Sequence, residues 1–258
     1  MSKDIKAIYD FDYRLIDEYF LGMERQGPGS PRVTIQALDF IDNLTDQSCI
    51  ADIRCGTGGQ TMVLAQNTRG KITAIDLSPE HIRKLNDTAE RLSLQNRVNG
   101  IVGSMDNLPF HDEEFDLIWS EGSIYKLGFV RDLNECRRFL KKGGTIAISQ
   151  ISWFTSERPT EIENFWEKFY SEIDTIPNKV QQMQEAGYMP VATFVLPENC
   201  WTEHYFPLMD DAREIFLRKY AGNKAAKDLL KQEQYVKELY HKYKAYFGYA
   251  FYIGKRIN

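Results

Sequence analysis

IADIRCGTGG, at residues 50–59, joins a short apolar stretch directly to a glycine-rich turn. The residues after it, Gln60 to Asn67, are compatible with a helix. Glycine lets a backbone approach a ligand closely, and the first turn of a helix offers free N–H groups. The stretch therefore predicts an α/β fold with a nucleotide-like ligand at the turn, although a single glycine-rich turn also occurs without any ligand.

Acidic residues follow several of the later apolar runs. Asp76 ends the second run, twenty positions after Gly56, where a carboxylate suits the hydroxyls of a ribose. Asp106 follows the third run, and Glu121 follows the fourth. Ligands bind at the carboxyl edge of a parallel sheet, so we expect these acids to gather there. A G-x-G-x-x-G dinucleotide turn would need a glycine at position 61, which is Thr61 in this chain. This difference disfavours a nicotinamide-dependent oxidoreductase.

Four ordered motifs resemble those of class I S-adenosylmethionine-dependent methyltransferases: ADIRCGTGG, IDLSP, GSMDNLPF and FDLIWSEGSIY, all between residues 50 and 151. The resemblance implies that S-adenosylmethionine is the cofactor and that the first loop lies under its methionine part. It also implies that Asp76 holds the ribose and that Asp106 and Met105 bracket the adenine. Asp116 and the residues after it would line the floor beside the sulfonium. The cofactor-binding residues predicted in this way are Asp52, Arg54, Gly56, Gly58, Asp76, Leu77, Met105, Asp106, Ser120 and Glu121.

Arg54 departs from the pattern of that family. The family pattern is D-x-G-x-G-x-G, which Asp52, Gly56 and Gly58 match, whereas Arg54 stands at the first glycine position. A second positive charge near a sulfonium costs free energy when the site is partly desolvated. Three outcomes stay open: the side chain turns to solvent, reaches the cofactor carboxylate, or impairs cofactor binding.

The order of elements predicts a single methyltransferase domain over residues 1–258. Residues 1–46 form an N-terminal helical lid, residues 47–151 a cofactor-binding core, and residues 152–258 the remaining strands with a helical substrate cap. Alternating strands and helices predict an α/β, Rossmann-like sheet, mostly parallel and flanked by helices. The resemblance implies seven strands, the last of them antiparallel. Gly143 and Gly144 are expected to end a helix before the fifth strand.

Composition and charge restrict the class of partner. Hydrophobic residues make up 43% and charged residues 27% of the chain, as in ordinary globular proteins, and no apolar run reaches the length of a membrane span. The net charge of −5 argues against a nucleic-acid substrate. The first residues carry no apolar signal core, and the four cysteines form no C-x-x-C pair, so we expect free thiols in a cytoplasmic protein without a metal site.

The candidate catalytic residues are Glu121, Tyr125 and His204. A proton acceptor is needed only if the methyl acceptor must lose a proton early. Glu121 directly follows the fourth strand and could take that proton or bind an amine, or it could only hold backbone. His204 could equally be structural. Arg25 could meet a carboxylate of cofactor or substrate, or remain a solvated loop residue.

The function that these observations predict is methyl transfer from S-adenosylmethionine to a small-molecule acceptor. The alternative is a binding protein of the same fold that has lost catalysis through Arg54. The sequence identifies neither the acceptor nor the oligomeric state, because one fold serves many reactions. His81, His111 and His241 are interpreted as surface residues.

Overall fold

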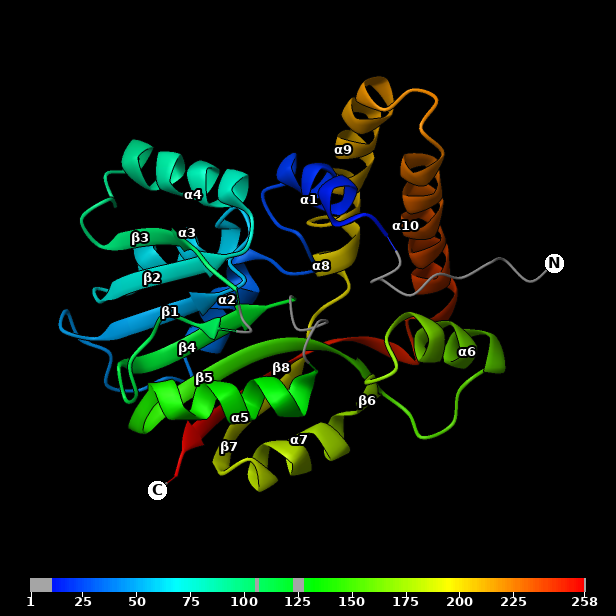
Figure 1. Cartoon of the computed structure of the whole chain (residues 1–258). Coiled ribbons are helices and arrows are strands. Elements are labelled where there is room, and N and C mark those ends of the chain that lie inside the picture. The colour runs from blue at the N-terminus through cyan, green and yellow to red at the C-terminus, as the bar shows by residue number, and fades with distance from the viewer. Residues whose placement is uncertain (1–10, 105–106, 123–127, 258) are drawn as a thin grey trace.

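The computed structural model describes residues 11–104, 107–122 and 128–257, and it has one mixed sheet of eight strands (Figure 1). The strand order is β3-β2-β1-β4-β5-β8-β7, with β6 paired to β5 beside this path. The pairs β1–β2, β1–β4, β2–β3, β4–β5 and β5–β6 are parallel, and β8 is antiparallel to both β5 and β7. The strands are β1 (Cys49–Ile53), β2 (Lys71–Asp76), β3 (Val98–Val102), β4 (Phe115–Glu121), β5 (Leu140–Trp153), β6 (Asp174–Thr175), β7 (Tyr188–Val195) and β8 (Phe247–Arg256).

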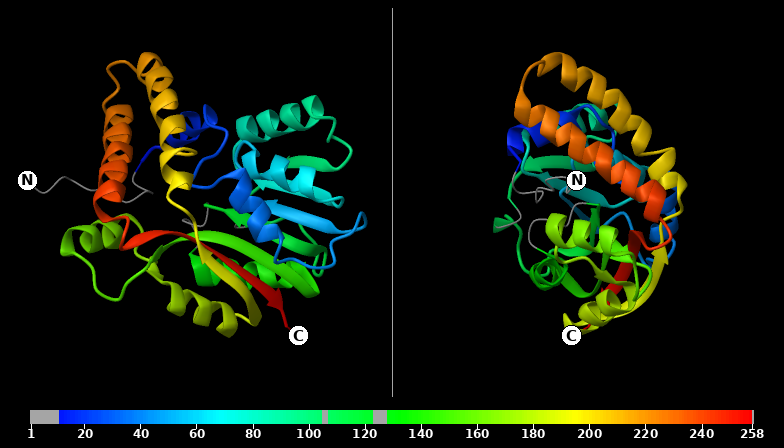
Figure 2. Two further views of the ribbon diagram at one scale, coloured as in Figure 1. Left: turned by 180° about the vertical axis from the view of Figure 1, so that it is seen from behind. Right: turned by 90° about the vertical axis from the view of Figure 1, so that its right-hand side faces the viewer.

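Helices cover the sheet and also gather beyond one of its edges. Five of them, α1, α6, α8, α9 and α10, lie past the carboxyl ends of the parallel strands, on the right of Figure 1. Of these, α9 and α10 run side by side as a hairpin (Figure 2). The helices are α1 (Tyr13–Leu21), α2 (Pro31–Leu38), α3 (Gly59–Asn67), α4 (Pro79–Arg91), α5 (Phe129–Phe139), α6 (Thr160–Phe169), α7 (Ile176–Glu185), α8 (Asn199–Thr202), α9 (Phe206–Lys219) and α10 (Lys224–Tyr243).

Two helix starts follow from local turn chemistry. The Ser30 hydroxyl accepts a hydrogen bond from the Val33 N–H, and Pro31 takes the first helical position of α2. Ser78 and Pro79 do the same at the start of α4. Proline fits there because the first helical N–H has no partner inside the helix. These starts set α2 and α4 next to the carboxyl edge of the sheet.

The sheet confirms the mostly parallel prediction and differs from it in two details. Pairing of Asp174 and Thr175 with β5 adds an eighth, two-residue strand, which is too short to leave a periodic signal. The fifth strand begins at Leu140 rather than after Gly144, because buried Leu140 already pairs with Phe115. The expectation that the two glycines end the helix is therefore wrong. The antiparallel last strand is confirmed.

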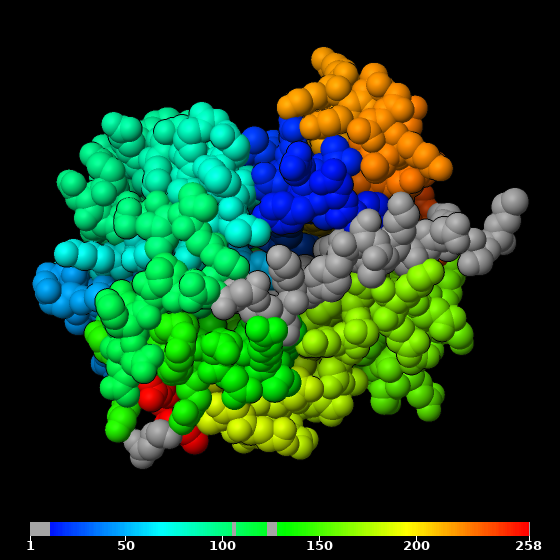
Figure 3. Space-filling view, in the orientation of Figure 1, coloured from blue at the N-terminus to red at the C-terminus, as the bar shows by residue number. Residues whose placement is uncertain are grey.

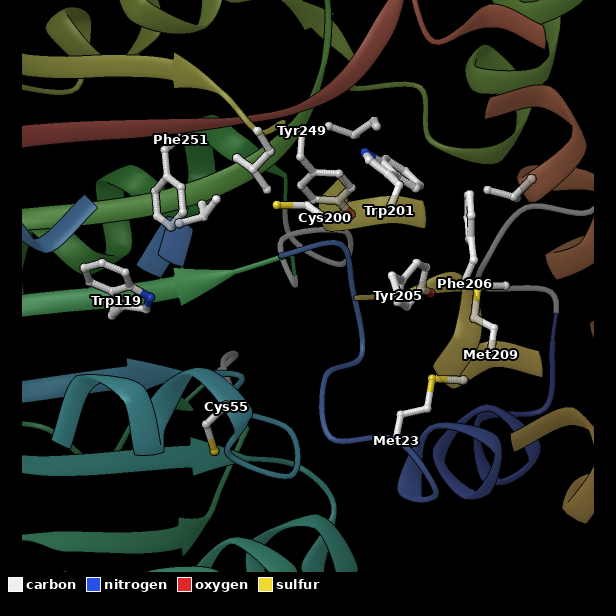
Figure 4. Packing of buried hydrophobic residues seen from close by; sticks show 14 of the residues in the cluster. Met23, Cys55, Trp119, Cys200, Trp201, Tyr205, Phe206, Met209, Tyr249 and Phe251 are labelled. Atoms are coloured by element: carbon white, nitrogen blue, oxygen red, sulfur yellow. The ribbon is translucent and has the colours of Figure 1, made fainter. Parts of the chain in front are cut away.

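Aromatic side chains form the core between the sheet and the helices beyond its edge (Figure 4). Trp201 of α8 is 2% exposed, stacks on Tyr240 with ring centroids 4.2 Å apart, and contacts Tyr249 of β8 at 5.5 Å. Trp166 of α6 packs edge-on against Phe247 at 5.4 Å. Such aromatic pairs contribute beyond the area they bury. They hold α6, α8 and α10 at the start of β8.

No helix in the described part of the chain combines the length and the apolar composition needed to cross a bilayer.

Candidate functional site

A cavity of about 240 Å³ lies at the carboxyl edge of the parallel strands. Residues 13–28, here called the N-terminal segment, form one wall of the cavity. Helix α1 of this segment lies between α4 and the α9–α10 hairpin (Figure 3). The loop from Arg54 to Gly58, here called the glycine loop, adds Arg54 and Gly56 to the lining. Residues of α10 and β8, among them Glu233 and Tyr249, complete the lining.

The glycine loop needs backbone angles that only glycine adopts freely. Gly56 and Gly58 have φ of +54° and +88°, in the left-handed region. Below the loop, Asp52 is fully buried and accepts hydrogen bonds from the Thr61 hydroxyl at 2.5 Å and from the Gln60 amide at 3.4 Å. Burial raises the pKa of Asp52 to about 7. Asp52 and Gly58 do not line the cavity, and the carboxyl group of Asp52 instead joins β1 to α3.

Arg54 adopts the same left-handed backbone, with φ of +58°. This explains why glycine suits the position, since a side chain there costs about 1–2 kcal/mol. The side chain lines the cavity, and its Nη1 is buried without a hydrogen bond to any described residue. The charge of Arg54 acts on Asp132, which is 1% exposed. Burial raises the pKa of Asp132 to about 7, and the Arg54 guanidinium opposes that rise. Of the three outcomes for Arg54, a turn to solvent does not occur here.

Asp76 ends β2 and is held by the backbone on both sides. Its Oδ2 accepts the Gly56 N–H and its Oδ1 accepts the Ser78 N–H, each at 3.0 Å. His81 Nδ1 lies 3.7 Å from Oδ1. Burial alone would raise the pKa of Asp76, but His81 and these N–H groups outweigh it, and the pKa is lowered. An ionised carboxylate therefore faces the cavity.

His81 is buried, so its interpretation as a surface residue is wrong. Its Nε2 lies 3.2 Å from the Asp17 backbone oxygen and 3.5 Å from the Asp17 carboxylate on α1. Burial would lower the pKa of His81, yet Asp76 and Asp17 raise it overall. The signal in the sequence is its place in the first turn of the helix that starts at Pro79, directly after the second strand. His81 links α1 to the end of β2.

Glu121 has both carboxylate oxygens engaged by protein groups. Arg25 Nη1 donates to Oε2 at 2.8 Å, while Thr34 Oγ1 and Trp119 Nε1 donate to Oε1 at 2.7 and 3.0 Å. The side chains of Arg25 and Glu121 are 8% and 4% exposed. The interpretation of Arg25 as a solvated loop residue is wrong, because Arg25 is buried and pairs with a carboxylate of the protein, whereas its contact with a ligand carboxylate stays a prediction. Glu121 lines the cavity but is occupied in holding the N-terminal segment.

Gln26 also ties the N-terminal segment to the glycine loop and was not predicted. Its amide donates to the Thr57 hydroxyl at 2.9 Å, and its carbonyl oxygen accepts the Thr57 N–H at 3.3 Å. The same side chain fills the space above Gly56, where an added Cβ would lie only 1.9 Å from Gln26 Oε1. Nothing local in the sequence indicates this contact.

The far half of the cavity is aromatic. Trp166, Trp201, Tyr205 and Tyr249 line it from α6, α8, the segment before α9, and β8. Three of these side chains are labelled in Figure 4, where they lie together at the end of the sheet. Glu233 of α10 adds a carboxylate to this half, and burial raises its pKa to about 7. Glu233 is not among the site residues predicted from the sequence.

The remaining predicted residues lie away from the cavity or outside the described residues. Ser120 is buried and donates to the Ile53 backbone oxygen at 3.0 Å, and neither it nor His204 lines the cavity. Asp116 binds the Cys49 N–H and Lys141 at the opposite end of β4, so the floor implied there is wrong for Asp116 itself. Leu77 lines the cavity. Met105, Asp106 and Tyr125 lie outside the described residues.

The chain is similar to known methyltransferases in both sequence and structure. A family model described as a methyltransferase domain matches residues 50–144. The chain is 28% identical over 163 residues to chloroplastic tocopherol O-methyltransferase of Arabidopsis thaliana, covering 62% of this chain and 42% of that protein. It is 31% identical over 124 residues to dimethylglycine N-methyltransferase of Parasynechococcus marenigrum, covering 46% and 43%. The chain thus spans less than half the length of these curated relatives.

A solved structure extends the likeness over nearly the whole chain. The S-adenosylmethionine-dependent methyltransferase of Geobacter sulfurreducens, in complex with S-adenosylhomocysteine, superimposes with a TM-score of 0.81. It is 17% identical, and the superposition covers 95% of this chain and 98% of that one. At this identity the likeness concerns the fold. The matched family model thus identifies residues 50–144 as a methyltransferase domain, and the whole chain is similar in fold to an S-adenosylmethionine-dependent methyltransferase.

Proposed function

We propose that the protein transfers a methyl group from S-adenosylmethionine to a small-molecule acceptor. The observation that carries this proposal is the ionised Asp76 at the end of β2, held by N–H groups beside the glycine loop and open to an enclosed cavity. A carboxylate in this position suits two neighbouring ribose hydroxyls. The match of residues 50–144 to a methyltransferase domain supports the same reaction.

The residues around the cavity fit this cofactor. Asp76 would accept hydrogen bonds from the ribose, with Leu77 beside it. Arg54 Nη1 is a buried donor without a described partner, and a guanidinium suits the carboxylate of the methionine part. When bound, the cofactor would supply an electrophilic methyl group on sulfur. Asp52, buried below the glycine loop, and Gly58, its last residue, would keep the loop in shape.

The protein would act mainly by orienting the acceptor and excluding water. Arg25 and Gln26 hold the N-terminal segment over the glycine loop, and the α9–α10 hairpin encloses the other side. Glu121 serves in this proposal as an anchor for Arg25 rather than as a proton acceptor, because both its oxygens already accept hydrogen bonds.

Two further properties belong to the proposal. The net charge of −5 supports a small acceptor rather than a nucleic acid. Cys49, Cys55, Cys136 and Cys200 are free thiols, which supports a cytoplasmic location.

Calorimetric titration with S-adenosylhomocysteine tests the proposal. We expect the wild-type protein to bind it and NAD not to bind. Asp76→Asn should weaken binding at least about tenfold, since hydrogen bonds to a charged group contribute about 1.5–3 kcal/mol each. Asp87→Asn is the matched control, an exposed carboxylate on α4 away from the cavity. Binding of NAD, or equal affinity in both variants, would contradict the proposal.

A further inference from the structure

The charged groups along the cavity are unevenly neutralised. Arg25 is paired with Glu121, and His81 lies between Asp76 and Asp17. Among the charged side chains that the structure describes along this cavity, two are left, Arg54 and Glu233. Arg54 belongs to the glycine loop and is near Asp132, whereas Glu233 belongs to the aromatic half.

Glu233 has no partner of its own within the described chain. It makes no hydrogen bond or ion pair there, although it sits on a helix rich in lysine. Its charge reaches Tyr19 of α1, whose pKa is raised first by burial and then by Glu233. A carboxylate in such surroundings is costly to ionise unless a cation accompanies it. The raised pKa of Glu233, about 7, expresses this cost.

The walls around Glu233 suit a cation. Trp166, Trp201 and Tyr249 are each 2% exposed and line the same cavity as Glu233, with Tyr205 at 6%. Aromatic faces attract alkylammonium groups, and most strongly where water is excluded. The Trp166 Nε1–H is also buried without a hydrogen-bond partner among the described residues, as expected of a wall completed by a bound molecule.

We propose that Glu233 binds a cationic nitrogen of the methyl acceptor, so that the acceptors of this protein are amines with an apolar body. An anionic acceptor would be repelled by the Glu233 carboxylate. A neutral alcohol would lack the positive charge that offsets the cost of burying this carboxylate. The identity of this amine as the methyl acceptor rests on the proposed function. The cation site itself stands on the described residues.

Three probes of one size but different charge test this inference. Benzylamine, benzyl alcohol and benzoate are titrated into the full chain near pH 8, where Glu233 is ionised, with and without S-adenosylhomocysteine. We expect benzylamine to bind at least about tenfold more tightly than the other two, the range of a charged hydrogen bond. Absence of benzylamine binding, or equal binding of benzyl alcohol or benzoate, would overturn the proposal.

Two variants of α10 locate the charge. Glu233→Gln keeps the shape and should lower benzylamine affinity about tenfold or more while leaving benzyl alcohol unchanged. Glu238→Gln makes the same change at an exposed position of the same helix and should alter neither. Equal benzylamine affinity in both variants would refute the assignment to Glu233. S-adenosylhomocysteine affinity, measured on the same samples, separates failure of the proposed function from failure of the cation site. If the wild-type protein does not bind S-adenosylhomocysteine, the proposed function is refuted. If it binds S-adenosylhomocysteine but does not prefer benzylamine, the cation site is refuted.

Discussion

The buried pair between Arg25 and Glu121 should contribute strongly to stability. Arg25 Nη1 and Glu121 Oε2 are 2.8 Å apart, with side chains 8% and 4% exposed. At an effective dielectric constant of about 20, two unit charges at this distance attract each other by about 6 kcal/mol before desolvation is subtracted. Removing one partner leaves the other charge buried, and we expect Arg25→Met to cost about 3–5 kcal/mol.

The double variant distinguishes the pair from ordinary packing. In Arg25→Met with Glu121→Gln neither charge remains, and Thr34 and Trp119 can still donate to the side-chain oxygen at position 121. The double variant should therefore be much less destabilised than the sum of the two single variants. We expect a coupling free energy of about 2 kcal/mol or more.

Urea unfolding followed by circular dichroism measures these free energies. The control is Glu214→Gln, which breaks the exposed pair with Arg218, where the side chains are 74% and 79% exposed. Exposed pairs contribute little, so this variant should unfold at nearly the wild-type midpoint. The reasoning is refuted if Arg25→Met is no more destabilising than the control, or if the double variant equals the sum of the singles.

Three further predictions follow from the site and the core. Measured by calorimetry, Arg54→Met should weaken binding of S-adenosylhomocysteine about tenfold and leave unchanged the binding of 5′-methylthioadenosine, which lacks the carboxylate. An equal loss of affinity for both ligands would exclude Arg54 as the carboxylate partner. The pKa of His81 is raised, so its pairing with Asp76 and Asp17 stabilises the fold fully below the ordinary pKa of 6.5, and this stabilisation is lost as the pH rises through the raised pKa. The difference in unfolding free energy between the wild type and His81→Gln, measured by urea unfolding, should therefore shrink with rising pH. A constant difference would contradict the pairing. Trp201→Ala should lower the unfolding free energy by about 3–5 kcal/mol, because the ring is 2% exposed and stacked on Tyr240, and a change below about 1 kcal/mol would show that the surrounding core closes the space.

The elements near the glycine loop were predictable because their signals are local. Ser30 with Pro31 and Ser78 with Pro79 start helices through hydrogen bonds that span three residues. The run that ends in Asp76 is a strand, as expected, and the structure adds that its carboxylate accepts the Gly56 N–H. Turns, caps and strand ends depend on neighbours in the chain, so the sequence alone carries them.

The side chains that compose the cavity were decided by tertiary packing. Arg25 meets Glu121 across 96 positions of sequence, and no local pattern indicates that pair. Glu233 reaches the aromatic half only because α10 packs against α9 and β8 at the end of the sheet. His204 was chosen for its residue type, yet it does not line the cavity.

The conformation of the local backbone was thus predictable from the sequence, whereas the direction of the side chains around the cavity was not. Local sequence is enough to predict the loop, the order of most strands and helices, and the acid at the end of β2, because hydrogen bonds and steric limits between near neighbours specify them. Tertiary structure alone decided that Glu121 is occupied, that Arg54 turns to the cavity, and that Glu233 lacks a partner among the described residues. The charge left for a ligand depends on which distant side chains meet, and that is settled only when the elements pack.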